Sequence, residues 1–567
     1  ANNCTIGASN SGCSGQDYDY QSTDWNGPAN SGNGGGGGTS RYVLWSTTGH
    51  NGNPTTTIPG QGDIIKINDC GRIRILDTKL DFASVINDGA LAFETKNNQD
   101  AFSSELGPIT GTGTIFFDFN NGGTSPASLP SGDYGNQNNG FVATDSNSKF
   151  LFRIRDDHNY TIPTGIPVYP NVDFFSSSSN SGAFSNPSDG DFNGNRKFTL
   201  PAEDLTINGD LIIQAGARVL LNTSSDGDVT VNGNMTLGTI PSGNNGRIGA
   251  LQFQTSGTAR TFRVNGDITV INGDHDDGDN DGNNDFSIIE VLDGGSSSLV
   301  HTLITEGDIR LEDKGQINLV GNDAVAILEF QGDSSANFSQ DGASIDPEFY
   351  SIIMNKGSDT SVSYSFNDDF IISDPSTTGE QPIEIVNGLL ILNDLGIDVT
   401  LTDGTGDFYL PNTFNEEADP CSGGLDIRAG TIRVYGDNTG IVLDGYLGVN
   451  GSDAELDMLG ATNNGDNGNN YIEYTSSGCA EVEVTEGDLN IGSQFRRGTT
   501  ASTGIVKYTQ SGGSARFGVD GSAEKNRGIF EILGASSSFT LTGGDFNIER
   551  ENGSSTVGSL LLDPGSS

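Results

Sequence analysis

The chain has 567 residues, 81 glycines and a formal net charge of −48. Such an acidic field repels nucleic acid and anionic membrane surfaces, so the sequence predicts neither as a partner. No run approaches the ~18 apolar residues that a membrane helix needs, so no transmembrane segment is expected. Hydrophobic residues make up only 33% of the chain. They gather into strand-sized runs between Gly, Asn, Asp and Ser, which predicts an all-β protein.

Residues 1–57 are rich in Gly, Asn and Ser and are expected to form a lead-in and cap. The chain begins at Ala1 without an apolar leader, so we expect an exported protein whose signal peptide has been removed. The polar stretches 120–148 and 171–195 are expected to be loop insertions. Strand-like runs precede them at 58–69, 72–76, 90–95 and 110–119.

A short motif then recurs along the chain, in which a Gly followed by Asp or Asn separates two alternating runs. Apolar residues at every second position place one side of each strand in a core. Gly tolerates positive φ and the short polar side chain can bond nearby backbone, so each Gly is predicted to form a tight corner. The six copies are LTINGDLII (205–213), VTVNGNMTL (229–237), FRVNGDITV (262–270), LITEGDIRL (303–311), EVTEGDLNI (483–491) and TLTGGDFNI (540–548).

One such unit cannot bury its own apolar side, whereas stacked units bury a continuous core. The irregular spacing of the copies fits coils with loops of different length. A hairpin sheet can use similar corners. We predict a parallel β-helix (β-solenoid) over residues 58–567, right-handed as parallel crossovers usually are, with irregular loop insertions. The last run, GSLLLDPGSS (558–567), is a strand followed by a turn, so the solenoid is expected to continue beyond Ser567.

Several phrases resemble the β-solenoid regions of large secreted surface proteins of Bacteroidota, the type exported by the type IX secretion system. The resemblance extends in style over most of residues 58–562. It implies an exported, cell-surface adhesin or filament-like protein of the gliding-motility class. The phrases are IPGQGDIIKI (58–67), ITGTGTI (109–115), FYSIIMNK (349–356) and the recurring NGDLII and NGDITV corners.

The loop DHDDGDNDGNND (274–285) is the most distinctive local sequence. Oxygen ligands at alternate positions, with Gly282 at the sharp turn, match the first half of a calcium loop. The closing Glu of such a loop is missing, since that position is Ile288. A solvated acidic loop is the alternative, and DGDFNGN (189–195) is a weaker relative. The predicted calcium ligands are Asp277, Asp279, Asp281, Asn283 and Asp285.

The five cysteines contain no CxxC pair, so their spacing supports neither a zinc nor a redox site. A few cysteines in an exported chain favour structural bridges. We predict that Cys4 pairs with Cys13 and that Cys421 pairs with Cys479. The competing arrangement joins Cys70 to Cys4 or Cys13.

Acidic pairs are the residues that a polysaccharide-processing enzyme would need, because glycoside hydrolysis uses two carboxylates. Asp156-Asp157 lies beside His158, and Asp368-Asp369 forms a second pair. With 75 acidic residues, however, such pairs arise by chance. The nearby Arg153 and Arg155 are interpreted as surface charge, and the four histidines share no metal spacing.

We therefore expect a non-enzymatic, extracellular structural or adhesive protein. It would be a rigid β-solenoid rod whose loops bind polysaccharides or other surface ligands, and its further partners would be other copies or envelope proteins. Many weak contacts along such a rod would add up to firm attachment. The alternative is a parallel β-helix enzyme, either a polysaccharide lyase or a glycoside hydrolase.

Overall fold

A computed structural model gives the architecture of most of the chain. It divides into two compact units, residues 1–292 (unit 1) and 293–567 (unit 2), and each is described by itself. The described residues are 2–4, 24–25, 45–46, 54–55, 62–67, 72–76, 79–95, 99–144, 147–176, 196–214, 216–238, 248–271, 287–294, 298–312, 315–341, 346–372, 382–393, 398–401, 408–410, 422–434, 440–459, 470–475, 478–498, 504–519, 529–549 and 560–563.

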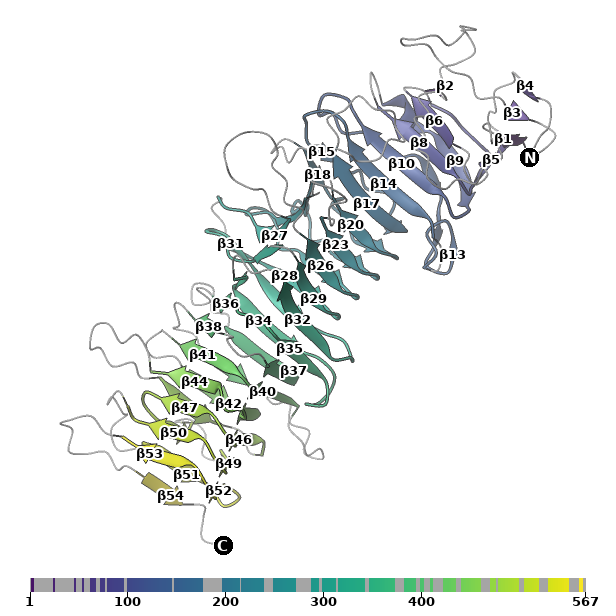
Figure 1. Ribbon diagram of the computed structural model, residues 1–567. Coiled ribbons are helices and arrows are strands. Elements are labelled where there is room, and N and C mark those ends of the chain that lie inside the picture. Colours follow the sequence, from purple (N-terminus) through teal and green to yellow (C-terminus); the bar gives the residue numbers. More distant parts are fainter. Residues whose placement is uncertain are drawn as a thin grey trace. The chain divides into compact units, whose positions relative to one another are not determined.

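Unit 1 is a parallel solenoid whose regular coils contain three strands each (Figure 1). Equivalent strands of successive coils pair in parallel, so that Leu205 lies opposite Val229 and Leu211 opposite Met235. These pairings confirm the predicted parallel β-solenoid, and its right hand stays a prediction. Three successive coils are β19 (Leu205–Ile207), β20 (Leu211–Ile213) and β21 (Ala217–Leu220); β22 (Val229–Val231), β23 (Met235–Leu237) and β24 (Gly249–Phe253); and β25 (Thr261–Val264), β26 (Ile268–Ile271) and β27 (Ile288–Val291).

We call the sheets that contain the first, second and third strand of each coil face 1, face 2 and face 3. Earlier strands of unit 1 extend these faces. Face 2 includes β2 (Asp24–Trp25), β6 (Arg72–Leu76), β8 (Ala90–Glu94), β10 (Thr114–Phe119), β14 (Lys149–Ile154) and β17 (Asn171–Ser176). Face 1 includes β16 (Val168–Tyr169), and face 3 includes β15 (Tyr160–Thr161) and β18 (Lys197–Thr199).

A further sheet precedes face 2 in the first coils. It contains β5 (Ile64–Ile67), β7 (Ser84–Asn87), β9 (Glu105–Thr110) and β11 (Ser131–Asp133), together with β1 (Asn2–Cys4), β3 (Trp45–Ser46) and β4 (Pro54–Thr55). Because β1 pairs in parallel with β5, part of the expected lead-in extends this sheet. The hairpin β12 (Gly135–Asn136) and β13 (Asn139–Gly140) and the 3-10 helix η1 (Asp100–Ser103) complete unit 1.

The loop prediction for 171–195 is wrong at its start. Residues 171–176 form β17, which pairs in parallel with β14 on face 2. Val172 and Phe174 are buried at alternate positions of this strand. The polar residues that follow 176 in the sequence hide this short alternating run. The stretch 120–148 likewise contains β11, β12 and β13.

Unit 2 repeats the three-strand plan. Face 1 contains β28 (Leu299–Thr305), β31 (Ala324–Phe330), β34 (Ser351–Asn355), β37 (Ile383–Leu392), β39 (Phe408–Leu410), β42 (Gly440–Leu443), β45 (Tyr471–Tyr474), β48 (Phe495–Arg497), β51 (Phe530–Leu533) and β54 (Leu560–Asp563). Face 2 contains β29 (Ile309–Glu312), β32 (Ala336–Asp341), β35 (Ser363–Phe366), the second half of β37, β40 (Gly423–Ile427), β43 (Tyr446–Val449), β46 (Ala480–Val484), β49 (Val506–Gln510) and β52 (Ser538–Leu541). Face 3 contains β30 (Gln316–Asn318), β33 (Glu348–Phe349), β36 (Ile371–Ile372), β38 (Asp398–Leu401), β41 (Gly430–Val434), β44 (Ala454–Met458), β47 (Asp488–Ile491), β50 (Ser514–Phe517) and β53 (Asp545–Ile548).

The core of each unit is a stack of like side chains from successive coils. In unit 1 the rings of Phe117, Phe152 and Phe174 are stacked, with centroids 4.9 Å apart for the first pair and 5.0 Å for the second. This spacing matches the ~4.8 Å between neighbouring strands, so parallel register places each ring on the one before. Such ring pairs add to the stabilisation that burial alone provides.

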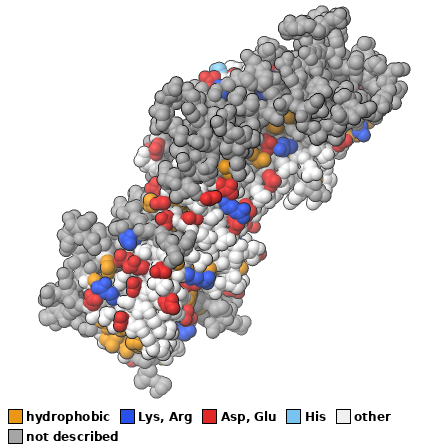
Figure 2. Space-filling model, in the orientation of Figure 1, with side chains coloured by type: hydrophobic (Ala, Val, Ile, Leu, Met, Phe, Trp, Pro, Cys, Tyr) orange, Lys and Arg blue, Asp and Glu red, His pale blue; other side chains and the backbone are white. Residues whose placement is uncertain are grey.

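Apolar side chains are least covered at the last described coil of unit 2. Four leucines there are 42–49% exposed, although the strands that carry them are regular. Figure 2 shows apolar side chains gathered at this end, over β52 to β54. The four leucines are Leu541, Leu560, Leu561 and Leu562.

The six copies of the Gly corner fall at two different corners of the coil. Four copies join a face 1 strand to a face 2 strand, as Gly209 does between β19 and β20. The copies at Gly487 and Gly544 instead join face 2 to face 3. The local motif therefore encodes a turn without specifying which corner of the solenoid it forms.

Positive φ explains the glycine at only one of the two corners. Gly487 and Gly544 have φ of 70° and 81°, as predicted from the tolerance of glycine for positive φ. Gly209, Gly233 and Gly266 are not among the positive-φ glycines, so this explanation is wrong for them. A Cβ on Gly233 would lie 2.4 Å from Oδ1 of Asp210, which belongs to the preceding coil. Close approach between coils excludes a side chain there.

Side-chain ladders line this corner of unit 1. The Asp210 backbone N–H donates to Asn171 Oδ1 (2.9 Å), the Asn234 N–H to Asp210 Oδ1 (2.8 Å), and the Asp267 N–H to Asn234 Oδ1 (2.9 Å). Each acidic or amide side chain thus accepts a bond from the next coil. A second ladder joins the amides of Asn208, Asn232 and Asn265. The Asp or Asn of the motif therefore ties coils together, beyond shaping its own turn.

A buried lysine occupies the equivalent corner of unit 2. Lys356 is fully buried, and its Nζ donates to the main-chain carbonyls of Glu306 (2.8 Å) and Gln331 (2.5 Å) from the two preceding coils. Burial lowers the pKa of Lys356 below its ordinary value of 10.5, although the carboxylates of Glu306 and Asp308 oppose the shift.

This lysine gives a pH-dependent stability. Between the lowered folded-state pKa and 10.5, the unfolded chain binds a proton that the folded chain has lost, so the free energy of unfolding rises with pH in that window. We expect the wild type to gain stability over Lys356→Met as the pH approaches 10.5 from below. Urea denaturation of both proteins between about pH 8 and pH 11 measures the difference. Parallel curves would contradict the prediction.

Candidate functional site

The predicted calcium and disulfide sites fall mostly outside the described residues. This applies to all five predicted calcium ligands, from Asp277 to Asp285, and to Cys13, Cys70 and Cys421, whereas Cys4 is described by its backbone alone. Cys479 is buried at 7% exposure. Both sites stay predictions. Within the described ranges, no group of three or more His, Cys, Asp or Glu side chains could hold a metal ion.

The acidic pair beside His158 holds a turn together. Asp156 Oδ2 accepts hydrogen bonds from the Gly122 N–H (2.8 Å) and from the Tyr160 hydroxyl (2.6 Å). Asp157 instead faces Arg196 at 3.6 Å, so the two carboxylates do not act on one point. Burial raises the pKa of Tyr160, which keeps its phenol protonated as the donor. In the second pair, Asp368 accepts a bond from the Gln340 N–H at 2.5 Å. Asp156, Asp157 and Asp368 are thus engaged with the protein's own groups.

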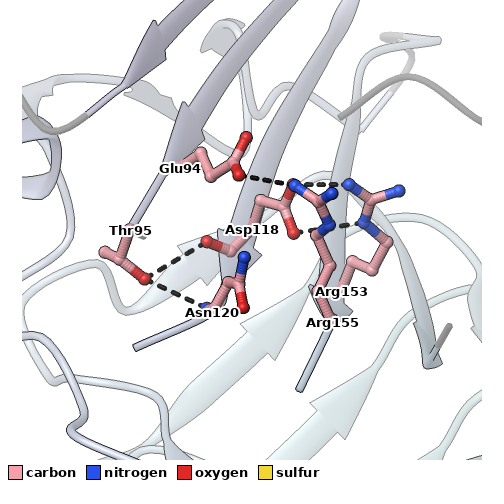
Figure 3. A network of polar contacts seen from close by, with 6 residues as sticks. All are labelled: Glu94, Thr95, Asp118, Asn120, Arg153 and Arg155. Carbon is pink, nitrogen blue, oxygen red and sulfur yellow. Dashed lines mark hydrogen bonds and ion pairs between the residues drawn. The ribbon is translucent and has the colours of Figure 1, made fainter. Parts of the chain in front are cut away.

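A buried charge network lies on the outward side of face 2 in unit 1 (Figure 3). Arg153 reaches Asp118 through Nε (3.1 Å) and Nη2 (2.5 Å), while Arg155 Nη1 reaches Glu94 Oε1 (2.5 Å). Thr95 donates to the Asp118 carbonyl, and the Asn120 N–H donates to Thr95. The side chains of Arg153 and Asp118 are each only 1% exposed.

The interpretation of Arg153 and Arg155 as surface charge is therefore wrong. Strand alternation does point both side chains away from the core, but they are buried there. Their two positive charges balance the carboxylates of Glu94 and Asp118. A closed, charge-balanced network serves the structure and offers no open surface to a ligand.

An accessible polar cluster lies on the outward side of face 2 in unit 2. The cluster spans three neighbouring strands, β40, β43 and β46. Their register places Asp426 opposite Gly448, and Gly448 opposite Glu483. Leu425, Leu447 and Val482 fill the core from the alternate positions. We call this cluster the Tyr446 site; its members are Asp426, Arg428, Tyr446, Gly448, Asn450, Glu483 and Thr485.

The side chains of the Tyr446 site form one directed chain of hydrogen bonds. Asn450 Nδ2 donates to Asp426 Oδ1 (2.9 Å) and to the Tyr446 hydroxyl (2.6 Å), which in turn donates to Glu483 Oε2 (2.9 Å). Arg428 Nε donates to Asp426 Oδ2 at 2.7 Å, and Thr485 Oγ1 donates to Asn450 Oδ1 at 3.1 Å. Each side chain therefore has a fixed donor or acceptor role.

Gly448 allows the tyrosine side chain to lie along its own strand. A Cβ at Gly448 would meet the Tyr446 hydroxyl at 2.6 Å and Asp426 Oδ1 at 2.5 Å. The phenol therefore passes directly over Gly448 and reaches the amide of Asn450 four residues along its own strand. An aromatic residue, a glycine and an amide at alternate positions of YLGVN (446–450) are the sequence signal for this arrangement.

The electrostatics of the site keep the phenol protonated. Burial raises the pKa of Tyr446 above its ordinary value of 10.0, and the nearby carboxylates of Asp426 and Glu483 act in the same direction. The hydroxyl therefore donates to Glu483 at physiological pH. Tyr446, Asn450, Glu483 and Thr485 all remain partly exposed, in contrast to the closed network of unit 1.

Comparisons with known proteins assign no function to the chain. No protein-family model, characterised protein or solved structure matches the chain. Among the described residues, no helix has the length and apolar character to span a membrane.

Proposed function

We propose that this chain is an extracellular, non-enzymatic adhesive protein whose rigid solenoid binds polysaccharide on the outward sides of its strands. The observation that carries the proposal is the Tyr446 site, a partly exposed aromatic and polar cluster held on a regular sheet. Strands fixed on both sides by parallel neighbours present such side chains with little freedom to lose on binding. Localisation outside the cell follows the composition and the resemblance to secreted surface proteins, and a calcium-binding loop at 274–285 belongs to the same proposal.

Binding without turnover is the expected result. The purified chain, incubated with insoluble neutral polysaccharides and sedimented, should be depleted from solution in a saturable manner. The supernatant should contain no new reducing ends and no unsaturated products. Saturable binding with stoichiometric recovery of intact polysaccharide would support adhesion. Absence of binding to every polysaccharide, anionic ones included, would contradict it.

The alternative is a polysaccharide-processing enzyme, and one observation favours it. Asp426 and Glu483 flank Gly448 on one side of a sheet, and glycosidases use two carboxylates across one bond. Against this, both oxygens of Asp426 already accept bonds, from Arg428 and Asn450. Release of reducing ends that disappears in Glu483→Gln would favour the enzyme.

A further inference from the structure

Resting on the proposed adhesive function, we propose that the Tyr446 site binds a single neutral hexopyranose unit of a polysaccharide. The Tyr446 ring would be the platform under the sugar, and the flanking side chains would bind its hydroxyls. Uronic acids and other anionic sugars would be excluded.

Two glycines of the sheet determine where the Tyr446 ring lies. The phenol lies along its strand over Gly448, and Tyr446 remains partly exposed, so the exposed part of its ring is the platform in this proposal. Gly424 in the preceding strand leaves room for the same side chain, since a Cβ there would lie 3.0 Å from the Cβ of Tyr446. An aromatic face bordered by polar groups suits a pyranose, which presents C–H groups on its faces and hydroxyls at its rim.

The rim of the platform can both donate and accept. Arg428 uses Nε for Asp426, and its side chain is 47% exposed, so the guanidinium has further N–H donors to offer at the rim. Glu483 and Thr485 border the opposite side and supply acceptor oxygens. Donors on one side and acceptors on the other match the vicinal hydroxyls of a sugar, each of which can donate and accept.

Charge selects against anionic sugars. The site has two carboxylates, Asp426 and Glu483, and one cation, Arg428, which is already bonded to Asp426. On the same side of the sheet, Lys507 is paired with Glu481 at 2.5 Å. An added carboxylate would therefore meet a net negative surface, and like-charge contacts disfavour the wrong partner.

The test compares matched polysaccharides and matched variants. The probes are cellulose, mannan and galactan, and cellulose whose C6 hydroxyls have been oxidised to carboxylates. We expect at least one neutral polysaccharide to bind, and oxidation to weaken cellulose binding if cellulose is that ligand. Tyr446→Ala should weaken binding about tenfold or more, and Tyr446→Phe about fivefold through the lost hydroxyl. Gly448→Ala should act like Tyr446→Ala, because its Cβ lifts the phenol off the sheet.

The matched control is Tyr471→Ala on face 1. The ring of Tyr471 is covered by the guanidinium of Arg496 at 4.3 Å, so it is not available as a platform and its loss should leave affinity unchanged. Circular dichroism and thermal melting establish that each variant is folded, and Tyr446→Phe provides the test if Gly448→Ala does not fold. Wild-type binding that Tyr446→Ala leaves unchanged would overturn this site while the adhesive function stands. A wild type that binds only anionic polysaccharides would also overturn the site, and one that binds none would overturn both proposals.

Discussion

Replacing Gly233 by alanine is expected to destabilise unit 1 by roughly 2–3 kcal/mol, as overpacking in a close-packed region does. The new Cβ would lie 2.4 Å from Asp210 Oδ1 and 2.7 Å from the carbonyl carbon of Gly209. Asp210 would have to move and would lose its bond from the Asn234 N–H, while the Gly209 backbone cannot give way as a side chain can. Urea denaturation measures the loss of stability. Hydrogen–deuterium exchange of the peptide that contains Asn234 should show the local loosening.

Two further variants separate two contributions to the loss of stability: the clash of the new Cβ and the loss of the hydrogen bond to Asp210. Asp210→Ala alone removes the acceptor and should cost about 1 kcal/mol. In Gly233→Ala combined with Asp210→Ala, the side-chain clash is absent, so the double variant should be less destabilised than the sum of the two singles. Thr236→Ala, at an outward position of β23, is the matched control and should change stability little. A neutral Gly233→Ala would show that the coils can separate at this corner.

The alternation of apolar residues within single strands predicted much of this fold. It could not predict which corner of the coil each Gly turn forms. In LTINGDLII the apolar positions Leu205, Ile207, Leu211 and Ile213 are all buried, because a period of two is a property of the strand itself. Whether a Gly-Asp turn joins face 1 to face 2 or face 2 to face 3 depends on how many strands precede it in the coil. That count is not contained in nine residues, so the motif predicts a turn without predicting its corner.

The candidate sites were also predictable only in part, because they depend on contacts between residues distant in sequence. Strand alternation points the side chain of Arg153 away from the core, but its burial involves residues distant in sequence, such as Asp118 and Phe175. The Tyr446 site required the register of three strands, which brings Asp426, Gly448 and Glu483 into line. Before that register is known, YLGVN is one apolar run among many. Its glycine is the clue, since glycine inside a strand often marks a bulge, a bend or a close approach by another group.

Removing Arg153 is expected to have the largest effect on stability. Arg153→Met would leave Asp118, a carboxylate with 1% of its side chain exposed, beside Glu94 with Arg155 as the remaining cation. Breaking a buried pair costs roughly 3–5 kcal/mol, because an uncompensated charge stays out of water. Asp118→Leu should cost a similar amount by leaving the guanidinium of Arg153 buried. Chemical denaturation of each variant gives the values.

The double variant tests whether the loss of stability in each single variant comes from an unpaired charge. Arg153→Met with Asp118→Leu removes both charges of the pair, while Arg155 and Glu94 still balance each other at 2.5 Å. It should therefore be more stable than either single variant, since apolar replacements of similar size can substitute for a buried ion pair. The exposed pair Lys79 and Glu105, 2.9 Å apart with side chains 43% and 57% exposed, is the matched control. Alanine at either of those positions should cost at most about 1 kcal/mol. If the losses of Arg153→Met and Asp118→Leu simply add in the double variant, the two side chains stabilise unit 1 by packing, and their charges are not coupled.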